Sequence, residues 1–187
     1  FPFAKVTGIG DIVDDKNLKK VLGDFEDFKG TFSGDFFYNK TGFGGNTHLN
    51  NISVFDKKRN LPVNLNSGDI KFSGNDLKLN ALNLSWGHTP VLLDAAIDDY
   101  DTKEPKFNVF VSTNLNEESL DKLINPMLQF PLKTKGEFTV KGRLRGTPND
   151  YTIFANAILN PGVDLYYMGS DIGDLENKRE IIARLDF

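Results

Sequence analysis

The side chains that most often carry out chemistry are few and scattered in this 187-residue sequence. The chain has no cysteine, which excludes disulfides and thiol chemistry. Its two histidines, His48 and His88, are far apart and show no HxxxH spacing, so we interpret them as turn residues. Ser33, Ser73 and Ser85 lack the strand–turn–helix context of a nucleophile. We therefore predict that the chain is not an enzyme and carries no metal or cofactor.

Three further clusters have non-catalytic interpretations. Four carboxylates lie close together in the sequence, at Asp98, Asp99, Asp101 and Glu104. They lack the spacing and the central glycine of an EF-hand, so we predict a solvated polar turn. The glycines at positions 42, 44 and 45 are not followed by the Lys-Ser/Thr of a phosphate-binding loop, so they predict a hairpin. The acids Asp171, Asp174 and Glu176 could mimic a glycosidase pair, but carboxylates are too common for this to be informative.

The composition excludes several classes of protein. The net charge is −4 and no basic block occurs, so a nucleic-acid partner has no electrostatic support. The mean hydropathy is −0.35, and no apolar run approaches the ~18–20 residues of a spanning helix. The chain begins at Phe1 without Met and shows no signal-like segment, so we expect it to be an excerpt from a longer protein.

The stretch from Gly68 to Ile97 shows how the elements are organised. Apolar and polar residues alternate along short runs separated by Gly, Asn and Pro, which predicts antiparallel strands with one apolar and one polar side. The apolar positions change phase between Ala81 and Leu82, and a phase change of one residue predicts a β-bulge.

Similar strands, about 5–8 residues long, are predicted along most of the chain. Pro62 cannot donate to a strand ladder, which predicts an edge strand or a bulge there. Short helices are predicted after Asp14 and after Asn116, the second with Leu120, Leu123 and Ile124 buried and with Pro126 at its end. The last segment, 179–187, fits a strand or a helix.

A weak internal repeat relates the two halves of the chain. In each half a capped helix is followed by an apolar linker and a Gly-x-Phe strand, at Gly30 and Phe32 and again at Gly136 and Phe138. This predicts one segment of a longer repeat protein with two partial units, about 1–112 and 113–187.

One-sided strands must hide their apolar faces from water. The sheet could pair with a second sheet as a sandwich, close on itself, or curl and leave an apolar groove. The one-sided strands along the chain predict an all-β fold, and 16 Phe, one Trp and few long helices to act as a lid favour a curled sheet or a sandwich. Its form is an elongated antiparallel curled sheet, a β-taco-like groove with two short helices; a β-sandwich is the alternative.

Three segments resemble the repeat units of the AsmA-like family of bacterial envelope proteins, which includes TamB. They are GDIKFSGNDLKL (68–79), ALNLSWGHTPVLLDAAI (81–97) and GEFTVKGRLRGTPNDYTIFANAIL (136–159), and the resemblance covers about residues 28 to 168. It implies an elongated periplasmic protein, membrane-anchored through parts outside this chain, with an apolar inner groove. Such proteins are linked to moving phospholipid between membranes or assisting outer-membrane assembly.

The resemblance implies acyl chains of phospholipids as ligands. Through the parent protein it also implies contact with the inner and outer membranes and with an outer-membrane assembly protein. No catalytic residue is carried over. The predicted groove residues are Ile70, Phe72, Leu77, Leu79, Val91, Leu93, Phe107, Val109, Val111, Phe138 and Val140. The alternative function is a structural or adhesive β-repeat module without a lipid ligand.

Overall fold

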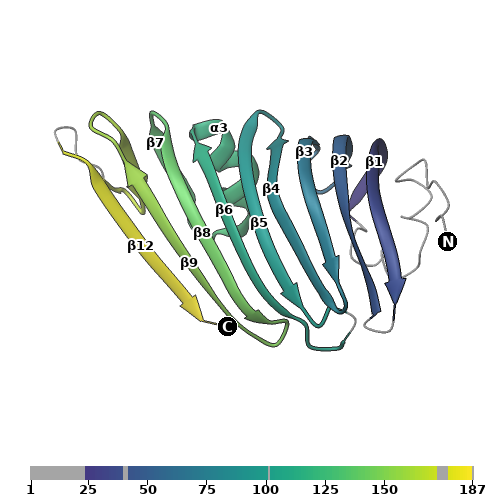
Figure 1. The fold of residues 1–187 in the computed structure, drawn as a ribbon. Coiled ribbons are helices and arrows are strands. Elements are labelled where there is room, and N and C mark those ends of the chain that lie inside the picture. The colour runs from purple at the N-terminus through teal and green to yellow at the C-terminus, as the bar shows by residue number, and fades with distance from the viewer. Residues whose placement is uncertain (1–23, 40–41, 101, 172–176, 187) are drawn as a thin grey trace.

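The computed structural model describes residues 24–39, 42–100, 102–171 and 177–186 and shows an all-β protein. Its main element is an open antiparallel sheet of nine strands, β1-β2-β3-β4-β5-β6-β8-β9-β12, with β1 and β12 at the edges (Figure 1). The strands are β1 Phe25–Asn39, β2 Gly42–Asp56, β3 Leu61–Ser73, β4 Asp76–Trp86, β5 Thr89–Asp98, β6 Lys106–Leu115, β8 Phe138–Thr147, β9 Asp150–Leu159 and β12 Arg179–Asp186.

A short helical segment and a small second sheet lie between and after these strands. The helical segment consists of α3 (Glu117–Ser119), the π-helical η1 (Leu120–Ile124) and the 3₁₀-helical η2 (Asn125–Met127). It lies against one face of the large sheet, near one end of the strands (Figure 1). The second sheet has the order β11-β10-β7 and contains β7 (Leu132–Lys135), β10 (Asp164–Tyr167) and β11 (Ser170–Asp171).

The predicted β-bulge in the stretch from Gly68 to Ile97 is confirmed. The register between β4 and β5 shifts between Leu79 and Leu82, and Ala81 adopts a positive φ of 49°. The Ala81 amide donates to Asp94 Oδ1 at 2.8 Å. Because the extra residue restores the alternation, Leu79 and Leu82 point to the same face of the sheet.

The strands are longer than the predicted 5–8 residues, since β1 and β2 each contain 15. In several places the alternation of apolar and polar residues shifts by one position, which makes the sequence look like several short strands. In the structure these shifts are irregularities within continuous strands. For example, β3 runs from Leu61 to Ser73 through register shifts between Leu65 and Asp69. A bulge changes the alternation without ending the hydrogen-bonded ladder, so the pattern underestimates strand length.

The prediction of an edge strand or a bulge at Pro62 is wrong. Strand β3 is internal, between β2 and β4, and the register around Pro62 is regular. The Pro62 carbonyl accepts a hydrogen bond from the Gly87 amide at 2.7 Å, beyond the last β3–β4 register pair at Val63 and Trp86. The N–H and C=O of one strand residue point to the same side. The missing N–H therefore faces Gly87, just beyond the end of the β3–β4 ladder, and the internal β2–β3 ladder does not need it.

For the second predicted helix, the structure confirms the capping residue and the buried side chains. Asn116 caps α3, Leu120 and Leu123 are buried, and Ile124 is half-buried. Pro126 lies within η2 rather than ending the segment. The first predicted helix lies outside the described residues, and so the helix of the first half, on which the internal repeat partly rests, cannot be compared with the second. The final segment forms a strand, β12.

The β-sandwich alternative is not found in the described part of the chain, because the second sheet has only three short strands against nine. The large sheet continues through the predicted unit boundary at 112, which lies inside β6, and the division into two units stays a prediction. His48 lies within β2 rather than in a turn, whereas His88 is in the turn between β4 and β5. No described helix is long and apolar enough to cross a membrane.

Candidate functional site

All eleven predicted groove residues lie on one face of the large sheet, which we call the apolar face. Residues that are directly opposite in an antiparallel pair point to the same face, so the register settles the placement. One row runs through Phe72, Leu77, Ile97 and Phe107, and the next through Ile70, Leu79, Ala95 and Val109. The same pairing links Leu93 to Val111, Val91 through Thr113 to Val140, and Leu115 to Phe138.

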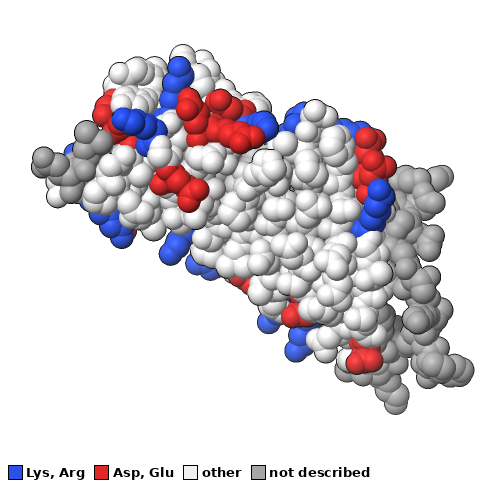
Figure 2. Space-filling model, turned by 90° about the horizontal axis from the view of Figure 1, so that it is seen from above, with Lys and Arg blue, Asp and Glu red and all other residues white. Residues whose placement is uncertain are grey.

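The apolar face extends beyond the predicted residues over the neighbouring strands. Between β2 and β9 the only charged side chain that the register places on it is Asp56, at one end of β2. Figure 2 shows a broad area without charged side chains across the molecule, with Lys, Arg, Asp and Glu mainly along its margins. Further members are Leu49, Ile52, Val54, Val63, Leu65, Leu82, Leu84, Leu144 and Ile153.

The opposite face of the sheet carries most of the charged side chains, together with exposed apolar ones such as Leu92, Phe110 and Phe154. It carries the cross-strand pair His48 and Asp69, whose Nδ1 and Oδ1 atoms are 2.7 Å apart at an exposed position. The other charged residues on this face include Lys71, Lys78, Asp94, Lys141, Arg143 and Arg145. The sheet therefore separates a side with many charges from one on which, between β2 and β9, Asp56 is the only charge.

The helical segment and the second sheet cover one end of the apolar face, which we call the covered end. One apolar core closes this end, and each of its six side chains is at most 6% exposed. The large sheet contributes Leu115, Phe138 and Leu159, the helical segment Leu120, and the second sheet and the residue before it Leu165 and Val163. Phe138 is only 3% exposed and so belongs to this core.

The rest of the predicted residues are half-buried rather than buried. Val140 packs against the core of the covered end. Nine others neither belong to this core nor pack against it, and we call them the open part of the apolar face. They are Ile70, Phe72, Leu77, Leu79, Val91, Leu93, Phe107, Val109 and Val111. Their partial exposure reflects shielding by neighbours on the same sheet.

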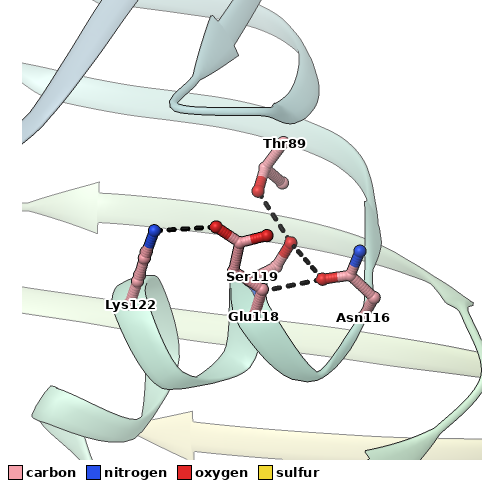
Figure 3. A network of polar contacts seen from close by, with 5 residues as sticks. All are labelled: Thr89, Asn116, Glu118, Ser119 and Lys122. Carbon is pink, nitrogen blue, oxygen red and sulfur yellow. Dashed lines mark hydrogen bonds and ion pairs between the residues drawn. The ribbon is translucent and has the colours of Figure 1, made fainter.

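A small polar network attaches the helical segment to β5 at the covered end (Figure 3). Asn116 Oδ1 accepts from the Ser119 amide at 2.9 Å and from Ser119 Oγ at 3.1 Å. Because a hydroxyl has one proton, Thr89 is the donor in its 2.7 Å contact with Ser119 Oγ. Lys122 Nζ donates to Glu118 Oε1 at 2.7 Å, and this hydrogen bond lowers the pKa of Glu118.

A second polar cluster, around Asp56, was not predicted from the sequence. The fully buried Asp56 carboxylate accepts from Trp86 Nε1, from Arg59 Nη1 and from the Arg59 amide, each at 3.1 Å. The Arg59 guanidinium carbon also lies 5.0 Å from the centroid of the Trp86 ring. Asp56 and Trp86 are thirty positions apart, so no local pattern could have shown this contact.

The other candidate clusters do not form a chemical site among the described residues. No three His, Asp or Glu side chains converge closely enough to hold a metal ion in this part of the chain. Asp98 ends β5, and positions 99 to 105 form an exposed connection in which Asp101 is not described. Asp174 and Glu176 also lie outside the described residues.

Comparisons of the chain with family models, with curated proteins and with solved structures found no match. The apolar face is therefore interpreted from its own geometry. Its defining features are the scarcity of charge, the partial exposure of its open part and the buried apolar core at its covered end.

Proposed function

We propose that the open part of the apolar face binds the acyl chains of phospholipids. In this proposal the chain is a groove segment of an AsmA-like envelope protein in the periplasm, anchored in the membrane through other parts of its parent. It carries phospholipid between membranes or assists outer-membrane assembly. The observation that supports the proposal most is that nine half-buried apolar side chains share one face without a charge among them.

The continuity of apolar side chains across neighbouring strands favours an apolar ligand. Monomeric soluble proteins rarely expose contiguous apolar patches larger than a few hundred Å², and larger patches mark binding sites. Completing the burial of the half-buried Leu, Val and Phe side chains gains roughly 25 cal/mol per Å² of apolar surface. A ligand that covers several rows at once is thereby held without any directional contact.

The chemistry of the open part favours acyl chains over a polar or peptide ligand. Its side chains are aliphatic or aromatic, so they offer no donors or acceptors to a ligand. A bound peptide would bury backbone amides that need hydrogen-bonding partners, and a polar group buried without one costs several kcal/mol. An acyl chain has no such groups.

The covered end supports the alternative, a structural or adhesive module without a lipid ligand. There the chain's own residues bury the same face, with Leu120 and Leu159 each 1% exposed. A further protein element could cover the open part in the same way. The two functions differ in what touches Leu79 and Val109.

A site-specific photo-crosslinker tests this directly. We expect benzoylphenylalanine at Leu79 or Val109 to capture phospholipid in cells that express the chain, detected by mass spectrometry of the crosslinked protein. Lys78 and Asn108 are matched controls, because each precedes a test position on the same strand and points to the opposite face. Capture at the controls only, or of protein alone at the test positions, would contradict lipid binding.

A further inference from the structure

Three cations follow one another on strand β8, on the face of the large sheet opposite the apolar face, which we call the charged face. Lys141, Arg143 and Arg145 are exposed and occupy alternate positions of this internal strand. Alternate residues of a strand point to the same face, at intervals of about 6.4–6.8 Å. None of the three forms an ion pair with a carboxylate in the described part of the chain, and Arg143 Nε donates to Asn108 Oδ1 at 2.9 Å.

Two surface hollows lie along these cations. The first, of about 340 Å³, has Phe110 of β6 and Phe154 of β9 on either side of Arg143, because the register places the three directly opposite one another. Both rings are 38% exposed. The second hollow, of about 440 Å³, continues past Arg145 towards the turn between β8 and β9. Asn108 lines both hollows, so they adjoin, and we call them together the basic groove.

Acidic side chains border the basic groove on three sides. Asp94 of β5 and Asp186 of β12 each lie two strands away from β8 on the charged face. Asp98 and Asp150 lie at the end of the second hollow, near the turn between β8 and β9. The positive charge is therefore confined to a short line along β8. A broad anionic surface such as a membrane would meet these acids as well as the cations, whereas a linear anion would meet mainly the cations.

We propose that the basic groove binds an extended acidic segment of a partner protein, with its carboxylates over Lys141, Arg143 and Arg145. Side chains on one face of an extended polypeptide recur every second residue, at the same interval of about 6.4–6.8 Å as the cations. Glu or Asp at every second position of the segment therefore meets all three cations in register. Arg143 keeps both of its Nη groups for a bidentate contact with one carboxylate. The rings of Phe110 and Phe154 cover the methylene groups of that side chain.

The arrangement of rings and cations favours a polypeptide over a single-stranded nucleic acid. Proteins that bind single strands combine a longer track of cations with aromatic side chains on which successive bases stack. Here the row consists of three cations, and the two rings flank the same cation instead of following one another along the strand. An acidic segment needs only the matching interval between charges.

The basic groove and the open part of the apolar face lie on opposite sides of the same strands. On β6 and β8 the residues of the groove alternate with those that point to the apolar face. The acidic segment lies over the sheet and adds no strand to it, so its binding depends on the internal strands alone. The proposal therefore does not rest on lipid binding, and either can fail without the other.

Fluorescence anisotropy with labelled peptides tests the spacing. The probe is a peptide of about ten residues in which Glu and Ser alternate, and the control has the same number of Glu at every third position. We expect saturable binding of the alternating peptide, at least about fivefold tighter than of the control, because only alternation sets the carboxylates at the interval of the cations. Raising the ionic strength to about 1 M should abolish most of the binding.

Charge reversal on β8 tests the site. Arg143→Glu should weaken binding of the alternating peptide by at least about tenfold, because a repulsive carboxylate replaces the central cation, and Arg143→Gln should weaken it by a smaller factor. Lys78→Glu is the charge-matched control, since Lys78 is exposed on the same face of β4, three strands from β8. That separation of about 14 Å exceeds the Debye length at 0.1 M salt, so its affinity should stay within about twofold.

Three results would overturn the proposal. They are the absence of saturable binding of the alternating peptide, equal affinity for the two peptides, and equal losses for Arg143→Glu and Lys78→Glu. Binding of oligodeoxythymidine or of phosphatidylglycerol vesicles that Arg143→Glu weakens more than it weakens peptide binding would also overturn it, because the groove would then recognise a nucleic acid or a membrane. None of these results decides whether the open part of the apolar face binds acyl chains.

Discussion

The two ends of the apolar face have the same alternation of residues and different surroundings. At the covered end Phe138 and Leu159 are at most 3% exposed beneath the helical segment and the second sheet. In the open part Leu79 and Val109 occupy equivalent positions on internal strands and remain half-buried. The strand pattern is therefore not sufficient to tell a core from a surface.

The difference shows what each end needs to be stable. The covered end is closed by apolar contacts to Leu120 and by the hydrogen bond between Thr89 and Ser119. Among the described residues the helical segment and the second sheet make no such contact with the open part, which is held by the strand ladders on both sides. Substitutions should therefore destabilise the covered end strongly, whereas those in the open part should mainly affect binding.

The largest effect on stability is expected for Leu120→Ala. Leu120 is 1% exposed in the core cluster, so the change leaves a cavity and should lower the free energy of unfolding by about 3–4 kcal/mol. Leu79→Ala in the open part should cost only about 1 kcal/mol, because less surface is buried there. Urea denaturation of both variants measures the difference, and equal losses would contradict the division into two regions.

Asp56→Ala should lower the free energy of unfolding by slightly less, about 2–3 kcal/mol. The change leaves Trp86 Nε1–H and the Arg59 guanidinium without their buried acceptor. Asp69→Ala is the matched control, because Asp69 is paired with His48 on the exposed face and its loss should cost little. Thermal unfolding of the two variants checks this, and a large loss for Asp69→Ala would count against it.

The alternation along the strands could be predicted because it depends on neighbouring residues. The bulge at Ala81, the cap at Asn116 and the shared face of the groove residues are local or period-2 features, and the structure confirms the first two and places the groove residues on one face. The length of β3 and the contact of Asp56 with Trp86 depend on distant partners. For the same reason the sequence could not show which end the helical segment covers.

A moderate effect is expected where the helical segment attaches to β5. Ser119→Ala removes a hydroxyl that accepts a hydrogen bond from Thr89 and donates one to Asn116. The change should lower the free energy of unfolding by about 1–2 kcal/mol. The double variant with Thr89→Val should cost less than the sum of the single changes, because Thr89 has already lost its partner. Additive losses in a double-mutant cycle would show that the two hydroxyls do not interact.

The smallest effect concerns the pH dependence of Glu118. The hydrogen bond from Lys122 lowers the pKa of Glu118 below 4.5 in the folded chain, so the charged form favours folding. This contribution is present above the ordinary pKa and is lost as the pH falls through the lowered one. Glu118→Gln should lower Tm slightly at pH 7, and this loss of Tm should shrink as the pH falls through the lowered pKa of Glu118; a loss that grows with falling pH would contradict the sign.

The central claim is that the open part of the apolar face accommodates acyl chains, and native mass spectrometry of the purified chain incubated with phospholipid tests it most directly. The account predicts bound phospholipid on the natural chain and on Asn108→Asp, and loss of most of it on Val109→Asp, which adds a charge to the apolar face. Equal lipid binding by the two variants, or none by the natural chain, would contradict the account.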